Sequence, residues 1–381
     1  MESIPPPTTT PSAGQRILQI AVNVLVVLSL IYLLITAVGM VGSGFKLASG
    51  GQSAAEGFLA QATNPIIGLI LGIFATALVQ SSSTVTSVIV GLVATGQVPV
   101  YMAVPMIMGA NIGTTVTNTI VSLAHITRPQ EFRQAFAAAT VHDLFNFIAV
   151  TIFLPLEIIT RYSFGVGLIE GMTSPVAEFL LGPDGTQAAA GAAKKAINIK
   201  DFNVIKSASK TIIHLFYDPG DPDTGLLSGL GRFYGGISLC VVAIAMIFGC
   251  IWAMGRFLKA KLVGRAERIF HAAVGRGPLT GIASGTAITI MVQSSSTTTS
   301  LVVPMAGAGI MRLEQVFPFT LGANIGTTVT ALLASMAASK HPEAGLHIAL
   351  VHLVFNLMAT VVIYGIPWLR RLPLIGARWL A

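Results

Sequence analysis

The sequence has little charge and almost no cysteine. Only 10% of its 381 residues are Asp, Glu, Lys or Arg, whereas a soluble domain carries about 25% of these types. No charged residue occurs from position 57 to position 127. Hydrophobic types make up 53% of the chain, and the mean hydropathy is +0.78. This composition argues against a disordered chain, a nucleic-acid-binding protein and a soluble enzyme, and it predicts an integral membrane protein.

The sequence also lacks the motifs of several classes of enzyme and of disulfide-linked or metal-binding proteins. The two cysteines, Cys240 and Cys250, lie in one apolar stretch, so we expect neither a disulfide framework nor a metal site built on them. The sequence contains no G-x-x-x-x-G-K-[ST] loop for nucleotide phosphates and no G-x-S-x-G nucleophile motif. We therefore expect a protein that is not an enzyme.

An internal repeat is the largest feature of what is present. A shift of 213 residues superposes Pro65–Thr117 on Pro278–Thr330 without a gap, and 24 of the 53 aligned positions are identical. After a slip of three residues, His142-x-x-Phe145-Asn146 aligns with His352-x-x-Phe355-Asn356. The chain thus holds two copies of one unit, the usual mark of a repeat architecture.

The charged loops indicate how the two copies are oriented. The loop 256–276 before the second copy is strongly basic, with six Lys or Arg and one acid, and belongs in the cytoplasm. The loop 42–63 before the first copy carries one Lys and one Glu, and it follows an apolar run, 17–41, that begins after Arg16. We read that run as a retained first helix, which places this loop outside. Equivalent loops on opposite sides predict inverted-topology repeats, which are typical of secondary transporters.

The fold class we predict is an all-α polytopic membrane protein with two inverted-topology repeats, each containing a re-entrant helical hairpin and a broken transmembrane helix. We expect a multi-pass protein of the cell membrane with both termini in the cytoplasm. The expected segments are an N-terminal tail (1–16), a transmembrane helix and outer loop (17–64), repeat 1 (65–160), an extracytoplasmic linker (161–225), a transmembrane helix and basic loop (226–276), repeat 2 (277–369) and a C-terminal tail (370–381).

The first duplicated motif is Gln80-Ser81-Ser82-Ser83-Thr84, which returns as Gln293-Ser294-Ser295-Ser296-Thr297. Each copy lies between short apolar arms. A helical arm of about 15 residues rises about 22 Å, less than the roughly 30 Å of the hydrocarbon core, so we expect a hairpin with its polar tip in mid-membrane. Such a tip offers free N–H groups and hydroxyls to an anion or a cation. The alternative is that the hydroxyls only bond back to their own helices, and the duplication disfavours it.

The second duplicated motif runs from Gly109 to Thr117 and from Gly322 to Thr330. Two glycines around an Asn favour a broken helix, and the polar side chains beside the break would supply oxygen ligands to a hard cation such as Na⁺. The residues concerned are Asn111, Thr114 and Thr115, with Asn324, Thr327 and Thr328 as their partners. The alternative is a glycine-rich packing face.

A single acid, Asp143, lies between Arg133 and Glu157, and the second copy has Leu353 in its place. A carboxylate inside the membrane is costly and is a functional candidate by default, although satisfied burial is the alternative. We interpret His142 and His352 as satisfied core histidines rather than proton carriers. Asn146 lies one turn after His142 on the same helix face, so a local hydrogen bond between the two side chains is the simple interpretation.

Together with the stretch Ala139–Asn146, both duplicated motifs resemble the type II sodium-dependent phosphate cotransporters. The resemblance implies Na⁺-driven uptake of HPO₄²⁻ by alternating access, with sodium as the co-transported ion and the lipid bilayer as surroundings. It implies phosphate contacts at Ser81, Ser82, Ser83, Ser294, Ser295, Ser296, Asn111 and Asn324. It implies sodium ligands among Gln80, Thr114, Thr115, Asp143, Gln293, Ser294, Thr327, Thr328 and Thr330. The short linker without cysteine fits a minimal, bacterial-type member.

The resemblance also implies a stoichiometry. Asp143 occurs where electrogenic members carry an acid, which is associated with a third sodium ion. HPO₄²⁻ with three Na⁺ carries one positive charge, so we expect electrogenic transport. The residues alone leave open a Na⁺-coupled carrier for another oxyanion, such as a dicarboxylate or sulfate. They also leave open an ion channel and, with least support, an intramembrane enzyme.

Overall fold

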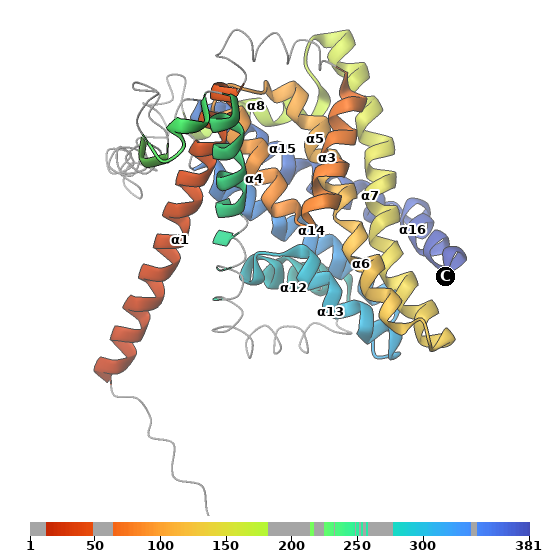
Figure 1. Cartoon of the computed structure of the whole chain (residues 1–381). Helices are drawn as coiled ribbons and strands as arrows, with labels where there is room; N and C mark the ends of the chain where they lie inside the picture. The colour runs from red at the N-terminus through yellow and green to blue at the C-terminus, as the bar shows by residue number, and fades with distance from the viewer. Residues whose placement is uncertain are drawn as a thin grey trace, which may run out of the picture.

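The computed structural model describes residues 13–48, 64–181, 214–216, 225–231, 233–247, 249–250, 253, 257, 277–336 and 341–381, and the regular structure in these segments is helical (Figure 1). The helices are α1 (Ala13–Ala48), α3 (Pro65–Val79), α4 (Ser82–Ala94), α5 (Val100–Gly113), α6 (Thr115–Ser122), α7 (Pro129–Phe164), α8 (Leu168–Leu181), α12 (Pro278–Val292), α13 (Ser295–Gly307), α14 (Leu313–Ser335), α15 (Pro342–Ala359) and α16 (Pro367–Leu380). Residues 42–48 of the expected outer loop belong to α1. The rest of that loop, most of the expected linker and almost all of the basic loop lie outside the described residues.

Helix length and composition make this a membrane protein. Among the described helices, three are long and apolar enough to cross a bilayer: α7, α14 and α15 with its π-helical extension to Tyr364. The helices α3, α4, α5 and α12 are apolar but have only 13 to 15 residues each. At 1.5 Å per residue they rise about 20–22 Å, which is too short to span the core.

Both Gln-Ser-Ser-Ser motifs break a helix in the same way. Helix α3 ends at Val79, Gln80 takes a left-handed conformation with φ of 56°, and Ser81 is the N-cap of α4. Helix α12 ends at Val292, Gln293 has φ of 57°, and Ser294 caps α13. Among the described residues these two glutamines are the only non-glycine residues with positive φ, a conformation that costs an L-residue energy. Both repeats therefore maintain the same energetically costly break at the same position of the motif.

Glycines on both helices of each pair let the first helix of a repeat pack closely against the third, α3 against α5 and α12 against α14. A Cβ on Gly109 would collide with the backbone carbonyl of Leu69, and a Cβ on Gly322 would collide with that of Ile282. In each pair the glycines are spaced four residues apart on both helices, the arrangement that lets membrane helices approach backbone to backbone. The spacings are Gly68/Gly72 against Gly109/Gly113, and Gly281/Gly285 against Gly322/Gly326.

This packing corrects the expectation of a broken helix in the second repeat, which is wrong. Helix α14 runs without interruption from Leu313 to Ser335, through both glycines of its motif. In the first repeat the helix is interrupted at Thr114, between α5 and α6. The glycines of α14 serve the contact with α12, and this tertiary contact outweighs their weak helix propensity.

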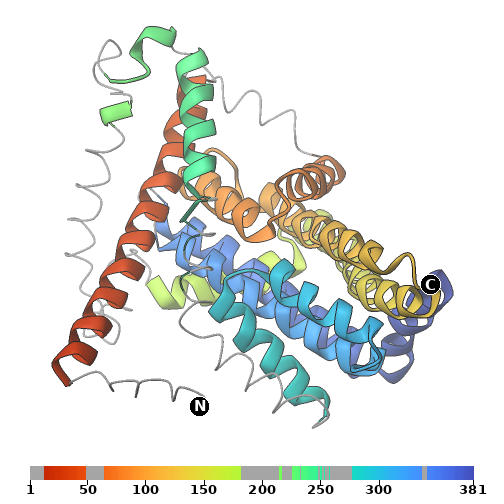
Figure 2. The same ribbon diagram turned by 60° about the horizontal axis from the view of Figure 1, so that its bottom comes forward.

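The rest of the packing joins one repeat to the other (Figure 2). Helix α4 lies against α14 and α15, whereas α13 lies against α6 and α7. Helix α8 packs on α15, and α16 packs on α7. The segment 161–225, expected to be a linker, thus begins with a packed helix, and the expected C-terminal tail 370–381 belongs to α16 rather than being a free end.

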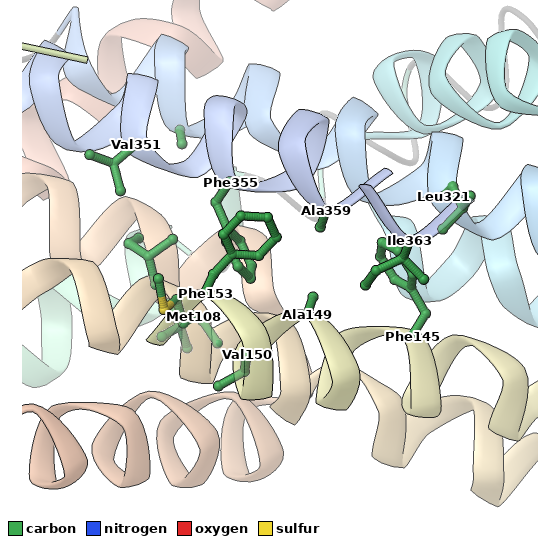
Figure 3. Close-up of a cluster of buried hydrophobic side chains, with 14 of the residues drawn as sticks. Met108, Phe145, Ala149, Val150, Phe153, Leu321, Val351, Phe355, Ala359 and Ile363 are labelled. Carbon is green, nitrogen blue, oxygen red and sulfur yellow. The ribbon is translucent and has the colours of Figure 1, made fainter. Parts of the chain in front are cut away.

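The apolar core forms where α7 and α15 face each other (Figure 3). The rings of Phe153 and Phe355 meet edge to face with centroids 6.0 Å apart, and both side chains are buried. Ala149 of α7 and Ala359 of α15 lie in the same cluster. A smaller cluster joins α1 to the helix Phe233–Ile247. The main core is therefore a seam between the two repeats, beside which the polar groups gather.

Candidate functional site

The two seryl tips are helix N-termini with hydroxyl caps. The Ser81 hydroxyl oxygen accepts a hydrogen bond from the backbone N–H of Thr84 at 3.3 Å, and the Ser294 oxygen accepts one from Thr297 at 3.2 Å. The first serine of each motif is therefore engaged in capping, as an ordinary N-cap would be.

The second and third serines of each tip remain available. Ser82, Ser83, Ser295 and Ser296 are the first two residues of α4 and α13, whose N–H groups have no intrahelical acceptor. Their hydroxyls form no hydrogen bond within the described part of the chain, and all four residues are 2–7% exposed. Each 13-residue helix therefore has a buried N-terminus, with two N–H and two O–H groups that no described protein group engages. Such a terminus suits an anion.

The two tip glutamines differ from each other. Gln293 is buried, and its Oε1 accepts a hydrogen bond from the Thr330 hydroxyl at 2.8 Å, which ties the second tip to α14. Gln80 is exposed, and its Nε2 donates to the Ala77 carbonyl at 2.5 Å. The sequence-equivalent glutamines thus differ in their exposure to solvent, and the Gln293–Thr330 hydrogen bond links the second tip to α14.

The threonines proposed as sodium ligands bond to their own helices. The hydroxyls of Thr114, Thr327 and Thr328 donate to the carbonyls of residues three or four positions earlier, at 2.7–3.0 Å. A hydroxyl that donates in this way keeps its oxygen lone pairs for a cation. Thr115 lies in α6, and its side chain is outside the described part of the structure.

Two asparagines that the sequence analysis places among the ligands, Asn111 and Asn324, link the repeats in the structure. Asn324 of α14 accepts a hydrogen bond from His142 Nε2 at 2.7 Å and donates to Asn146 Oδ1 at 2.7 Å. The mirror arrangement is made by Asn111 of α5, which accepts from His352 Nε2 at 3.2 Å and donates to Asn356 Oδ1 at 3.2 Å. The proton on each Nε2 is assigned from its acceptor. All six residues are at most 4% exposed.

We call these six residues the cross-repeat network. Asn146 Nδ2 also lies 3.2 Å from His142 Nε2, so the two side chains are in contact as the sequence suggests. Because that Nε2 donates to Asn324, however, the Asn146 amide donates to the Asn111 backbone carbonyl at 3.2 Å, and the side-chain hydrogen bonds cross between the repeats. A further link runs from Thr299 of α13 through Asn118 of α6 to His142. The side-chain amides of Asn111 and Asn324 are therefore engaged with protein partners, and both histidines are buried core groups.

The network predicts a coupled loss of stability. Asn324→Leu leaves the Asn146 oxygen and the His142 N–H buried without this partner, which we expect to cost about 1–3 kcal/mol of unfolding free energy. Adding Asn146→Leu should cost less than the sum of the two single changes, because the pair fails together. Unfolding in mixed micelles measures both, with Thr151→Val, an exposed residue of α7 that bonds only to its own helix, as control. Strict additivity would contradict the coupling.

Asp143 has an incomplete set of partners. Its Oδ2 accepts a hydrogen bond from the Thr119 hydroxyl at 3.3 Å, whereas its Oδ1 is buried with no partner in the described structure. Among the described residues no Lys or Arg forms an ion pair with it. A buried carboxylate oxygen without a donor is costly, and a bound cation would satisfy it.

The comparisons with known proteins agree over most of the chain. A sequence profile described as Na⁺/Pi-cotransporter matches residues 33–173 and 230–366. The chain is 33% identical to sodium-dependent phosphate transport protein 2A of Rattus norvegicus, over 94% of this chain and 64% of the relative. It is 30% identical to protein 2B of Homo sapiens, over 94% of this chain and 61% of the relative. The chain thus spans less than two thirds of these relatives. No solved structure matches it.

Proposed function

The chain belongs to the Na⁺/Pi-cotransporter family, and on this premise we propose that it is a secondary active transporter that takes up inorganic phosphate with sodium. The observation that carries the proposal is the pair of buried helix N-termini at Ser82–Ser83 and Ser295–Ser296, whose free N–H and hydroxyl groups suit HPO₄²⁻. Protein 2A and protein 2B, by their names, transport phosphate in a sodium-dependent way.

The architecture we propose is a pair of inverted repeats with re-entrant hairpins, α3–α4 and α12–α13. Three observations support it. The arms are too short to span the bilayer. The hairpin α3–α4 lies in the upper part of Figure 1, and α12–α13 lies in the lower part. The contacts of α4 with α14 and α15 are matched by those of α13 with α6 and α7. Motion of one repeat against the other would open the tips to either side in turn.

Sodium would supply most of the positive charge for phosphate. The motifs from Pro65 to Thr117 carry no Lys or Arg, so the first tip has no arginine clamp of its own. We propose that sodium is held by side-chain oxygens of the tips and of the second motif: Gln80, Gln293, Ser294, Thr114, Thr115, Thr327, Thr328 and Thr330. Attraction between unlike charges in a poorly screened site would then couple the two substrates.

The proposal is tested by uptake of radioactive phosphate into proteoliposomes under an inward Na⁺ gradient, with K⁺ as the replacement cation. Accumulation that requires Na⁺ and saturates supports a cotransporter and opposes a channel. An excess of sulfate or of a dicarboxylate that blocks uptake, and is itself accumulated, would favour the other oxyanion. Absence of phosphate accumulation in either cation would refute the function.

Asp143 gives a separate expectation about charge. We propose that its unpartnered oxygen helps to hold a third Na⁺, so that the loaded carrier bears one net positive charge. An inside-negative potential set with valinomycin should then accelerate uptake, since about 2.3 kcal/mol is available per charge per 100 mV. Asp143→Gly should abolish this acceleration. The control is Glu157→Gln, a buried acid of α7 whose oxygens accept hydrogen bonds from the backbone of Ile169 and Glu170. Unchanged potential dependence in Asp143→Gly would reject the third ion.

A further inference from the structure

A cavity of about 450 Å³ lies away from both tips, between the beginnings of α12, α14 and α16. Arg312, Arg370 and Arg371 line it, together with the apolar side chains of Phe317, Phe319 and Leu374. A second cavity of the same size shares Arg312 and adds further arginines at positions 133 and 378. Two adjoining cavities in a chain with few charged residues are thus lined by basic groups.

Among the described residues, no acidic side chain balances the positive charge of the arginines that line the first cavity. Its one acid, Glu314, forms an ion pair with Arg378. Within the described part of the chain, Arg312, Arg370 and Arg371 form no ion pair, and Arg370 lies over the Tyr364 ring with 5.3 Å to the centroid. Three uncompensated guanidinium groups around one hollow favour a doubly coordinated phosphate group, which arginine matches with its planar fork.

The surroundings favour a lipid over a soluble anion. Helix α16 has only 14 residues, and it exposes an apolar face made of Trp368 (65% exposed), Leu372 (44%), Ile375 (58%) and Trp379 (83%). These positions follow one another at helical spacing, and the exposed Arg371 lies beside them and also lines the cavity. A short helix with tryptophans and arginines is typical of the membrane interface, where Trp sits at headgroup level.

We propose that this cavity binds the phosphate group of an anionic phospholipid, whose acyl chains lie along the exposed face of α16. The charge distribution assigns this side of the protein to the cytoplasm, and basic pockets between helices on that side suit acidic headgroups. The site is distinct from the seryl tips, since it is lined by other residues of α12 and α14.

Tryptophan fluorescence tests the proposal directly. The chain has three tryptophans, and two of them are on α16. In full-length protein carrying Trp252→Phe, quenching by phosphatidylglycerol with brominated acyl chains is compared with quenching by brominated phosphatidylcholine at equal mole fraction in proteoliposomes. We expect half-maximal quenching at a mole fraction at least about fivefold lower for the anionic lipid.

Charge variants separate the cavity from a general surface effect. The triple change Arg312→Gln, Arg370→Gln, Arg371→Gln should remove the preference, and the same positions changed to Lys should retain most of it, which also controls for folding. Arg128→Gln, an arginine paired with Glu131 outside the cavity, should leave the preference unchanged. Equal quenching by both lipids in the parent protein, or a preference that survives the triple Gln change, would overturn the proposal. A preference abolished by inorganic phosphate would also overturn it, by assigning the cavity to a soluble anion.

Discussion

Ser295→Leu is expected to abolish sodium-dependent phosphate uptake. The leucine side chain would put a larger, apolar group at the buried N-terminus of α13, where Ser295 is 2% exposed and its hydroxyl has no partner within the described structure. The smaller change Ser295→Ala removes only the hydroxyl. A hydrogen bond to a charged group contributes about 1.5–3 kcal/mol, so this variant should bind phosphate roughly tenfold more weakly or worse. Uptake rates at subsaturating phosphate measure both effects.

Ser300→Leu is the matched control, since Ser300 is a half-buried residue of the same helix and lies more than one turn beyond the tip. Ser82→Leu in the first tip should behave like Ser295→Leu. Thermal unfolding and elution as a single species would establish that each variant is folded. Normal uptake by folded Ser82→Leu and Ser295→Leu would show that the seryl runs serve helix packing and do not bind phosphate.

Gly322→Ala is expected to destabilise the protein strongly. A single methyl group at this position meets the backbone carbonyl of Ile282, which cannot move aside without displacing α12. Forcing a methyl into a packed core costs about 1–3 kcal/mol, and a clash with backbone should reach or exceed the upper end. The thermal unfolding temperature should fall, and Gly109→Ala, which meets the Leu69 carbonyl, should do the same.

Gly365→Ala provides the comparison, because a Cβ at Gly365 has no atom within 4 Å. This variant should stay within about 0.5 kcal/mol of the parent protein, as surface substitutions usually do. If Gly322→Ala unfolded at the same temperature as Gly365→Ala, the backbone contact between α12 and α14 would not be as close as the structure has it.

The helix breaks at the two Gln-Ser-Ser-Ser motifs could be predicted from the sequence, because a polar run between two short apolar segments has few structural solutions. The course of α14 could not. Two glycines favour a helix break locally, and only the presence of α12, some 40 residues earlier in the chain, turns them into a contact surface. Helices α8 and α16 each contain a proline, Pro175 and Pro373. These helices lie largely within segments that the sequence analysis assigned to a linker and a tail.

The partners of Asn111 and Asn324 could not be predicted from the sequence either, because they come from the other repeat. Spacing along one helix suggests that His142 meets Asn146, and it does. Spacing cannot reveal that Asn111 meets Asn356 or that His142 meets Asn324, which are 245 and 182 positions apart. Sequence reasoning therefore singled out these polar residues but could not find their partners in the other repeat, and their contact with phosphate stays a prediction.

The cross-repeat network also has a consequence for how the chain is made. The partners of Asn111 lie 241 and 245 residues later in the chain. At about 5–20 residues per second, the ribosome synthesises them only about 12–50 s after Asn111. During that interval the Asn111 side chain lacks both of its partners and the His142 Nε2–H lacks Asn324, and polar groups without partners are costly in hydrocarbon. We therefore expect the polar groups of the first repeat to reach their final hydrogen-bond partners only after the second repeat has been made.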